Sequence, residues 1–392
     1  MSLPMLTRIK AQNLLSFGPE GIDLELPALT VLIGPNGSGK SNLLETVGLL
    51  KAAPRDIVAP IRESGGIGDW IWHGERSRPV ASVEACLNAS SGTCNLSHSV
   101  SLIGSGQMSI VRQEDVRFSL SNGGNGAAEF AWKRHWQNAT RTTSSGHDEP
   151  NAEERQIERD KSILSEVKDR VQFPELSTIT DFYERISLYR QWEFGPKAVI
   201  RHPQRIDVRP SPLMEDFSNL GMFLSRIRQH PKPKAELFER LGDLYSGLND
   251  FELNIEGGTV QIFFTEGEYS IPATRLSDGS LRYLCLLAIL LDPEPPSLVC
   301  IEEPELGFHP DLMPKLADLL VDASSRCQVI VTTHSDILVD ALSDRPESVV
   351  VCEKHDRQTS MRRLDRSDLA VWLEKYRLGE LWTRGQLGGV RW

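Results

Sequence analysis

Apolar residues recur along the chain at two spacings, and each spacing predicts a different kind of element. Between residues 5 and 33, turn residues separate three short apolar runs, which predict strands over residues 6–9, 22–26 and 29–33. From residue 41 to residue 50 the apolar residues return every three or four positions, which is the spacing of a buried helix face. The chain is therefore expected to open with strands that lead into a helix.

The segment that follows alternates polar and apolar positions in short runs. These runs cover residues 81–87, 97–103, 107–111 and 116–120, with turn residues between them. A period of two is typical of half-buried strands, so residues 79–130 predict an antiparallel β-subdomain.

The middle of the chain is expected to be partly helical. Residues 141–150 are rich in Ser, Thr and charged residues and predict a loop. No sustained heptad of apolar residues is visible, so a coiled coil is not expected. The apolar spacing predicts helices at about 153–170, 179–189, 213–229 and 233–248, and a hairpin of residues 251–255 and 260–264.

In the last third of the chain, predicted strands and helices alternate. Strands are expected at residues 297–302, 328–333 and 348–353, and helices at residues 283–291, 312–321 and 369–376. The whole pattern predicts an α/β fold, in which helices flank a mixed sheet, with an antiparallel β-subdomain and a compact, partly helical insert.

Composition and charge narrow the function classes. The chain has 392 residues, of which 40% are hydrophobic and 25% charged, as expected for a protein with a proper core. The net charge of −11 argues against a whole surface built to bind nucleic acid. Two basic clusters leave open either a local nucleic-acid strip or ordinary solvated faces. They are Arg201, Arg205 and Arg209, and Arg226, Arg228, Lys232 and Lys234.

Nothing in the sequence predicts a membrane or export signal. No apolar run approaches the roughly 18 residues of a membrane helix. The N-terminus has no apolar signal-peptide core, and the six cysteines form no C-x-x-C pair. We therefore expect a cytoplasmic protein with reduced cysteines, no structural zinc and no membrane partner.

The strongest motif is the run Gly34-Pro35-Asn36-Gly37-Ser38-Gly39-Lys40-Ser41, between the predicted strand at 29–33 and the following helix. Its pattern, G-x-x-x-x-G-K-[ST], is that of a phosphate-binding loop, and strand, loop and helix occur in the order that the mechanism requires. Glycines let the backbone N–H groups face an anion, and the start of the helix favours negative charge. The sequence therefore predicts that this protein binds a nucleoside triphosphate.

Three later motifs carry complementary chemistry. Leu276-Ser277-Asp278-Gly279-Ser280-Leu281-Arg282 precedes a long predicted helix, so a serine hydroxyl and helix-start N–H groups could cradle a second phosphate. The apolar strand at 297–302 delivers Glu302 and Glu303 to its carboxyl end, where open α/β sheets bind ligands. A further apolar strand ends in Thr332-Thr333-His334-Ser335.

Together these motifs resemble RecF/SMC-type ABC ATPases. The resemblance covers roughly residues 5–50 and 271–340, and it is weaker between them. The chain looks like a compact member of the RecF-like, overcoming-lysogenization-defect-like branch of AAA-family ATPases, without its coiled coil or Toprim nuclease. Leu-Ser-Asp-Gly differs from the common ABC signature Leu-Ser-Gly-Gly-Gln, because Asp278 and Ser280 replace a glycine and the glutamine. The resemblance implies an ABC-type P-loop ATPase head with ATP and Mg²⁺ as cofactors.

The resemblance also implies residue roles. Catalysis would involve Lys40, Glu303 and His334, the last as the switch histidine that contacts the γ-phosphate. Metal ligands would be Ser41 and Glu302, with Gln191 as a further candidate. Nucleotide would be held by Asn36, Gly37, Ser38, Gly39, Lys40 and Ser41, and by Ser277 and Gly279 from a second protomer. Arg62 matches an arginine that such ATPases use to touch DNA or nucleotide, and an ordinary surface arginine is the alternative.

The expected organisation is an N-terminal ATPase lobe at 1–135, a partly helical insert at 136–250 and a C-terminal ATPase lobe at 251–392. The leading hypothesis is an ATPase whose ATP-dependent head-to-tail dimerisation is a switch in phage defence, coupled to a separately encoded effector nuclease. The alternatives are a RecF-type DNA clamp for repair or recombination, a transporter ATPase subunit, and a module that holds ATP without turnover.

Overall fold

The computed structural model describes residues 5–74, 79–88, 94–106, 108–120, 128–145, 151–244 and 248–389. The chain divides into two compact units. The first unit comprises Met1–Ile186, Arg345–Tyr376 and Leu381–Trp392, and the second comprises Ser187–Asp344 and Arg377–Glu380. The fold class is mixed α/β, as the sequence predicted.

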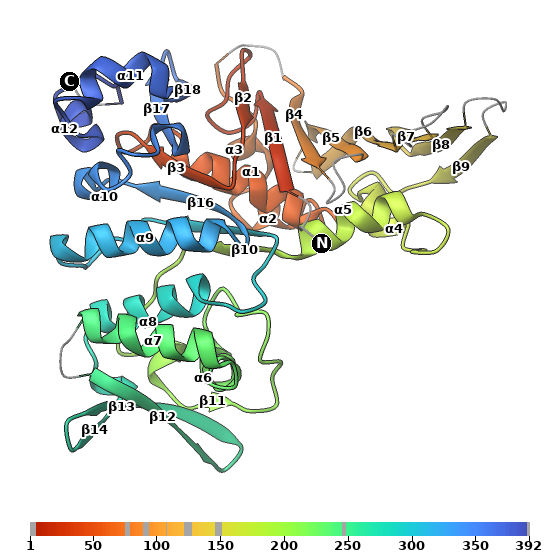
Figure 1. Ribbon diagram of the computed structural model, residues 1–392. Coiled ribbons are helices and arrows are strands. Elements are labelled where there is room, and N and C mark those ends of the chain that lie inside the picture. The colour runs from red at the N-terminus through yellow and green to blue at the C-terminus, as the bar shows by residue number, and fades with distance from the viewer. Residues whose placement is uncertain are drawn as a thin grey trace. The chain divides into compact units, whose positions relative to one another are not determined.

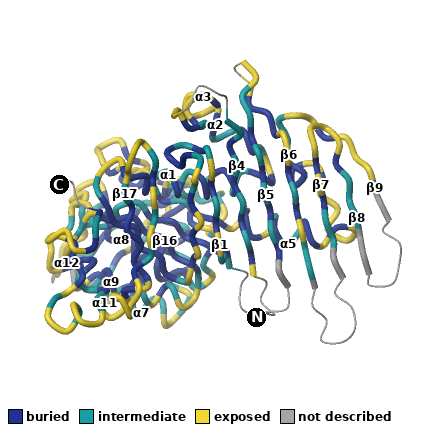
Figure 2. The backbone as a smooth tube through the Cα atoms, turned by 90° about the horizontal axis from the view of Figure 1, so that it is seen from above, coloured by how far each residue is buried: buried dark blue, intermediate teal, exposed yellow. Residues whose placement is uncertain are grey.

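An antiparallel sheet dominates the first unit (Figure 2). Within the described residues its eight strands follow the order β2-β1-β4-β5-β6-β7-β8-β9. Their bounds are β1 (Met5–Gln12), β2 (Ile22–Glu25), β4 (Ala81–Asn88), β5 (Cys94–Ser105), β6 (Met108–Leu120), β7 (Ala128–His135), β8 (Asn138–Ser145) and β9 (Asn151–Gln156). The predicted antiparallel β-subdomain is therefore confirmed.

The alternating sequence explains why this sheet has one buried face. Along β4 every second residue is buried, so one row of side chains faces the core. Two helices contribute to that core, α4 (Ile163–Glu166) and α5 (Pro174–Glu184). The Trp132 indole lies edge-on to the Phe173 ring at 5.3 Å between centroids, and its Nε1 donates to Glu175 at 3.3 Å.

A buried charged network joins strand β6 to the segment that begins α4. The Glu114 carboxylate accepts from His98 Nε2 at 3.0 Å, from Ser162 Oγ at 2.5 Å and from the Ile163 N–H at 2.7 Å. Arg134 Nη1 lies 3.6 Å from the same carboxylate, and all of these side chains are buried. Each lone pair of a buried carboxylate needs such a partner, so the network holds sheet and helix layer together.

The glycine-rich loop joins strand β3 to helix α1 in the first unit (Figure 1). Strand β3 pairs in parallel with β17, and β17 pairs with β18 in antiparallel fashion. The elements are β3 (Leu29–Ile33), α1 (Lys40–Ala52), α2 (Ala59–Glu63), α3 (Ile67–Trp70), η4 (Pro346–Ser348), β17 (Val349–His355), β18 (Gln358–Arg363) and α11 (Arg366–Leu373). Every residue of β3 is buried, as its apolar sequence predicted.

In the second unit, strand β15 lies between β10 and β16, and β15 and β16 run parallel. Both end in polar residues at the same edge, because parallel strands place their carboxyl ends together. The elements of this part are β10 (Ile186–Tyr189), α8 (Asp278–Leu290), β15 (Leu298–Glu302), η3 (Pro310–Leu312), α9 (Met313–Ser324), β16 (Gln328–Thr333) and α10 (Asp336–Asp340). Helix α12 (Leu378–Thr383) has residues in both units.

A small antiparallel sheet completes the second unit, near helices α6 and α7 in Figure 1. Strand β13 pairs with β11, β12 and β14, which confirms the predicted hairpin around Gly257 and Gly258. The elements are η1 (Val199–Arg201), β11 (Gln204–Arg205), α6 (Leu220–Ile227), α7 (Pro231–Leu244), β12 (Leu248–Glu256), β13 (Thr259–Glu266), β14 (Tyr269–Pro272) and η2 (Ala273–Arg275).

Three sequence expectations for the middle of the chain are wrong. The described part of the expected loop, residues 141–145, is the end of β8, and the rest of that loop lies outside the described residues. Residues 153–156 form strand β9 instead of starting a helix, because they pair with the edge of β8. Residues 186–189 form strand β10 instead of extending α5, since periodicity alone does not separate a short apolar strand from a buried helix segment.

The two units also divide the chain differently from the expected boundaries at 135 and 250. Strands β8 and β9, expected in the insert, pair with the N-terminal sheet. Strands β17 and β18, expected in the C-terminal lobe, belong to the first unit. Within the described residues, no helix is long and apolar enough to cross a membrane.

Candidate functional site

The glycine-rich loop of the first unit has the backbone that its sequence predicted. Gly34, Gly37 and Gly39 all have positive φ, at 146°, 77° and 97°. A Cβ on Gly39 would lie 2.2 Å from Thr359 Oγ1, and one on Gly34 would lie 2.2 Å from the Cys352 carbonyl oxygen. Both positions therefore require glycine for conformation and for space.

Lys40 lies inside the curve of this loop. Its Nζ donates to the Gly34 carbonyl at 2.9 Å and to the Pro35 carbonyl at 3.0 Å, and the side chain is buried. These bonds hold an ammonium group within the loop, where an incoming phosphate would need a cation. Ser41, the next residue, begins the first turn of α1 together with Lys40.

Strand β18 is hydrogen-bonded to the glycine-rich loop. Thr359 Oγ1 donates to the Ser38 carbonyl at 3.0 Å and lies 2.6 Å from Ser16 Oγ. Asn42 Nδ2 in turn donates to Ser16 Oγ at 2.5 Å. The loop is thereby held to two segments that are far from it in sequence.

Three observations show that this loop suits a phosphate group. Within the described residues, no side chain caps the start of α1 and no acid stands in its first turn. Ser38 Oγ is buried and, among the described residues, has no hydrogen-bond partner. A helix start with a buried cation and without competing acids is a ready anion site.

In the second unit, Glu302 ends strand β15 and meets residues that follow β10. Arg190 Nε donates to its carboxylate at 3.2 Å, and Trp192 Nε1 donates to its carbonyl at 2.7 Å. Gln191, the candidate metal ligand, stands between these two residues, and its side chain is exposed. The structure thus brings the segment of Gln191 to the carboxyl end of β15.

Glu303 has an unusual backbone. Its φ of 47° is left-handed, which is rare for residues other than glycine. Its N–H donates to the Thr332 carbonyl at 3.0 Å, so the turn is held by strand β16. The turn brings Glu303 Oε1 to 3.1 Å from His334 Nε2. Strained conformations of this kind cluster at functional sites.

Glu305, which follows β15, is hydrogen-bonded to the residues at the end of β16. Its Oε1 accepts from Thr333 Oγ1 at 2.7 Å and from the His334 N–H at 2.8 Å. Its Oε2 is buried and lacks a hydrogen-bond partner within the described ranges. Burial raises the pKa of Glu305 above its ordinary value, and the hydrogen bonds only partly offset that effect.

The predicted signature segment begins helix α8. Ser277 is its N-cap, with Oγ accepting from the Ser280 N–H at 3.1 Å. A Cβ on Gly279 would lie 3.1 Å from the Gly307 carbonyl oxygen, so the helix start packs closely on the turn after β15. Arg282, one turn further along, lies over the Trp192 and Phe194 rings at 5.0 and 5.4 Å.

The predicted residues are divided between the two units. In the first unit these are Asn36, Gly37, Ser38, Gly39, Lys40 and Ser41. In the second unit they are Gln191, Ser277, Gly279, Glu302, Glu303 and His334. Arg62 is exposed on α2 and pairs with Asp56.

The residues suit magnesium as well as phosphate. Mg²⁺ prefers oxygen ligands and is usually held by one or two carboxylates together with substrate phosphates and water. Within the described residues, no cluster of three or more His, Cys, Asp or Glu forms a complete metal site. A carboxylate such as Glu302 would therefore hold the ion only together with a bound nucleotide.

Four of the seven residues in the two basic clusters, all of them arginines, bond to groups within the second unit. Arg201 is buried and bonds to Asp278, and the exposed Arg205 bonds to Asp207. Arg226 bonds to Asp292 and Glu294, and Arg228 donates to the Phe251 carbonyl at 2.9 Å. The pairing favours structural and solvated roles over a nucleic-acid strip.

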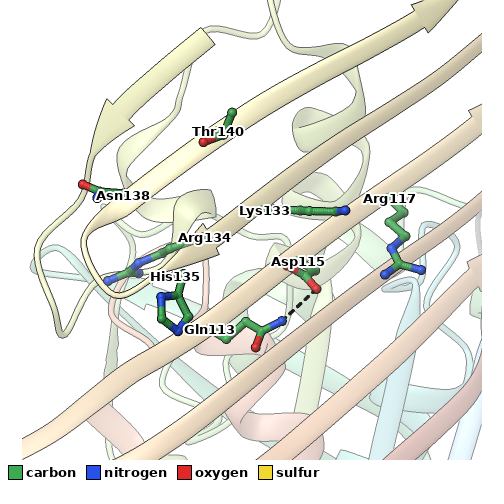
Figure 3. Close-up of a pocket in the computed structure, with 8 residues that line it drawn as sticks. All are labelled: Gln113, Asp115, Arg117, Lys133, Arg134, His135, Asn138 and Thr140. Atoms are coloured by element: carbon green, nitrogen blue, oxygen red, sulfur yellow. Dashed lines mark hydrogen bonds between the residues drawn. The ribbon is translucent and has the colours of Figure 1, made fainter. Parts of the chain in front are cut away.

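A hollow of about 560 Å³ lies on β6, β7 and β8, and none of the predicted site residues is among those that line it (Figure 3). Its charged side chains have both signs, with Arg117 and Lys133 near Asp115, and Asp115 accepts from Gln113 at 3.2 Å. Because these lining residues carry charges of both signs and form no recognisable catalytic or metal-binding group, we assign no function to this hollow.

Sequence reasoning missed three contributors. Arg190 and Trp192 lie on either side of Gln191, and only the pairing of β10 beside β15 brings them to Glu302. Glu305 follows Glu302 and Glu303 closely in the sequence, but its bond to His334 depends on the neighbouring strand. The one available signal was a third acid close behind Glu302 and Glu303.

Residues 29–92 and 113–340 match a protein family described as "AAA domain, putative AbiEii toxin, Type IV TA system". No curated protein matched the sequence.

Solved structures show the same fold. An Smc head bound to the C-terminal winged-helix domain of ScpA is 14% identical with a TM-score of 0.59, and the alignment covers 94% of this chain and 99% of that one. Smc heads from Pyrococcus furiosus and Pyrococcus yayanosii are each 12% identical, with TM-scores of 0.53 and 0.52. Each alignment covers 95% of this chain and 99% of the other. At this identity the likeness concerns the fold alone.

Proposed function

The chain belongs to this AAA-domain family and is an ATPase of the SMC-head-like type, and from that premise we propose that it is an ATP-driven switch. ATP would close two copies head to tail, and hydrolysis would let them part. The observation that carries the proposal is the Glu303–His334 pair at the carboxyl ends of β15 and β16, with 3.1 Å between Oε1 and Nε2.

Nucleotide binding is assigned to the loop of the first unit. The loop N–H groups from Asn36 to Gly39 would surround the phosphates, and Lys40 would exchange its carbonyl partners for phosphate oxygens. The same cation then neutralises charge on the substrate. Ser41 would turn its hydroxyl toward Mg²⁺, which supplies further neutralisation when bound.

Glu302 would share that ion, and Gln191 is the further candidate ligand. Arg190 bonds to the Glu302 carboxylate at 3.2 Å. Glu302 would therefore have to divide its oxygens between this guanidinium and the ion.

Glu303 is assigned the role of the base that orients the attacking water. Its left-handed turn directs the carboxylate toward His334, whose Nε2 can hold one oxygen while the other accepts from water. Glu305 bonds the His334 N–H and so supports the histidine from the backbone side. His334 would contact the γ-phosphate with the same ring.

The switch itself rests on the signature segment. In the ABC arrangement, Ser277 and Gly279 act on nucleotide held by a second protomer, so two nucleotides are bound at a two-fold interface. The start of α8 suits this role, since Ser277 is its N-cap and helix starts attract anions. Binding of ATP would then control assembly, and hydrolysis would time its release.

For the biological role, we propose phage defence with a separately encoded effector nuclease. The family description, "putative AbiEii toxin, Type IV TA system", supports the defence part of this choice. A DNA clamp is the competing role, and the acidic partners of Arg205 and Arg226 speak against it.

The first experiment is the light-scattering mass of Glu303→Gln with and without ATP·Mg²⁺, each with and without duplex DNA. We expect ATP to double the mass and DNA to add nothing. Lys40→Ala is the control and should stay at the smaller mass. A further rise with DNA would favour the clamp, and an ATP-insensitive monomer would contradict the switch.

A further inference from the structure

Arg201 is a buried arginine that bonds to three separate places in the second unit. Only 7% of its side chain is exposed. Its Nε donates to the Phe194 carbonyl at 2.6 Å, and its Nη2 bonds to Asp278 Oδ1. Its Nη1 lies within hydrogen-bond distance of the carbonyls of Ala273 at 3.2 Å, Thr274 at 3.2 Å and Leu276 at 2.8 Å.

A guanidinium imposes geometry on the groups that it binds. Its donors form a planar, rigid fork, so all acceptors must lie near one plane around it. Here the acceptors include the carbonyl of Leu276, directly before Ser277, and the carboxylate of Asp278, directly after it. Arg201 therefore fixes the chain on both sides of Ser277.

Asp278 is the position at which this signature departs from the common ABC sequence. An acid in the first turn of a helix is ordinary, because the helix dipole favours it. Capping of α8, however, is done by Ser277, and the Asp278 carboxylate bonds to Arg201. Although 70% of the Asp278 side chain is exposed, its charge is directed to a buried partner.

We infer that Arg201 is a positioning residue for the signature segment and that Asp278 is its anchor on that segment. The pair holds Ser277 and Gly279 in the orientation in which they meet nucleotide bound by a second copy of the chain. This inference rests on the proposed function and deepens it.

The same arginine connects the signature to the acidic strand end. Phe194, whose carbonyl it binds, stacks on Trp192 at 6.0 Å between ring centroids. Trp192 Nε1 donates to the Glu302 carbonyl at 2.7 Å. A shift of Arg201 would therefore move both the signature segment and the residues at the end of β15. A lysine could not replace it, because its single nitrogen could bind at most a few of these acceptors.

Variants of Asp278 test the inference at an exposed position that should not prevent folding. Asp278→Ala removes the acceptor and should lower kcat about tenfold to a hundredfold, with the affinity for a fluorescent ATP analogue unchanged. Asp278→Asn keeps an oxygen for Arg201 Nη2 and should recover most of that loss. Arg201→Gln should resemble Asp278→Ala or exceed it.

Mixing variants separates a positioning role from general damage. Lys40→Ala has an intact signature segment but a disabled phosphate loop. Asp278→Ala has an intact phosphate loop but a disturbed signature segment. In a head-to-tail dimer the mixture would contain one complete site per mixed pair, so activity should rise toward about a quarter of the wild-type rate. Ser277→Arg mixed with Lys40→Ala is the positive control for action between protomers.

The outcomes distinguish the inference from the proposal beneath it. Suppose first that the mixture of Ser277→Arg with Lys40→Ala recovers activity, so that the dimer stands. The positioning role is then wrong if Asp278→Ala alone is fully active, or if the mixture of Asp278→Ala with Lys40→Ala stays inactive. If the Ser277 mixture fails, the head-to-tail site is wrong and the inference falls with it. The exposed pair Arg205–Asp207 supplies the matched control, because Arg205→Gln with Asp207→Asn should change none of these rates.

Discussion

A fully buried glutamate of the first unit, Glu114, and a half-buried one of the second, Glu305, show how this chain uses acids for different purposes. Glu114 lies beneath the antiparallel sheet of the first unit, and Glu305 lies behind the ends of β15 and β16 in the second. Burial is complete for Glu114 and partial for Glu305, and burial by itself raises the pKa of a carboxyl group. The pKa of Glu114 is nevertheless lowered, while that of Glu305 is raised.

The difference comes from their partners. Burial acts most strongly on Glu114, but it is outweighed by the hydrogen bond and the electrostatic attraction of His98 together with the hydrogen bonds from Ser162 and the Ile163 N–H. Glu305 has partners on Oε1 alone, and its Oε2 is buried without one among the described residues. A fully partnered acid holds an architecture together, whereas a half-partnered acid beside Glu303 and His334 belongs to a site that must accept new groups.

Glu303→Gln should give the largest effect on the functional side of this comparison. Removing the base should lower the rate of ATP hydrolysis by about 10²–10⁴-fold. The melting temperature should change little, because the left-handed turn and its bond to the Thr332 carbonyl remain. Steady-state phosphate release and thermal unfolding measure the two quantities. Hydrolysis at the wild-type rate would exclude Glu303 as the base.

Glu114→Gln should give the largest effect on the structural side. It leaves His98 and Arg134 buried beside a neutral group, so the free energy of unfolding should fall by about 3–5 kcal/mol. Chemical denaturation measures this change, and nucleotide affinity of the folded fraction should be unaltered. A loss of hydrolysis without a loss of stability would contradict the division between the two acids.

The pH dependence of that loss has a definite sign. Because the folded-state pKa of Glu114 lies below its ordinary value of 4.5, its contribution to stability is present above pH 4.5. It disappears as the pH falls through the lowered pKa. The stability difference between wild type and Glu114→Gln should therefore be largest near neutral pH and shrink in acid, as urea titrations at several pH values would reveal.

Glu305→Gln should show the opposite slope and a smaller effect. The pKa of Glu305 is raised above 4.5, so its contribution to stability is present in acid and is lost as the pH rises through the raised pKa. The glutamine variant keeps the oxygen that bonds Thr333 and His334 and should gain stability over wild type as the pH increases. Melting temperatures measured from below pH 4.5 up to pH 8 provide the measurement. A constant difference would mean that Glu305 does not titrate in this range.

The smallest effect is expected at a surface pair that resembles neither acid. Arg170 and Asp181 are 65% and 52% exposed and lie 2.9 Å apart. Exposed pairs are screened by water and contribute about 0–1 kcal/mol, so Arg170→Gln should leave stability and hydrolysis within error. A loss of stability comparable with that of Glu114→Gln would show that burial does not explain why Glu114 stabilises the fold.

The sequence by itself was sufficient for the parts that depend on local pattern. The phosphate loop follows from glycines at positions that need positive φ, next to an apolar strand and a helix, and every one of these features lies within a short segment. The strands with clear alternation and the helices with clear spacing were likewise predicted, including β3, β15, β16 and α8. The mixed α/β class follows from their order.

Tertiary structure decided what depends on partners distant in the chain. Residues 151–156 have no strand pattern of their own and become β9 through pairing with β8. Glu114 and Ser162, and Arg201 and Asp278, are 48 and 77 positions apart, and no local spacing could pair them. The opposite pKa shifts of Glu114 and Glu305 have the same origin. The fold determines which donors reach each carboxylate, and those donors decide whether its charge is stabilised.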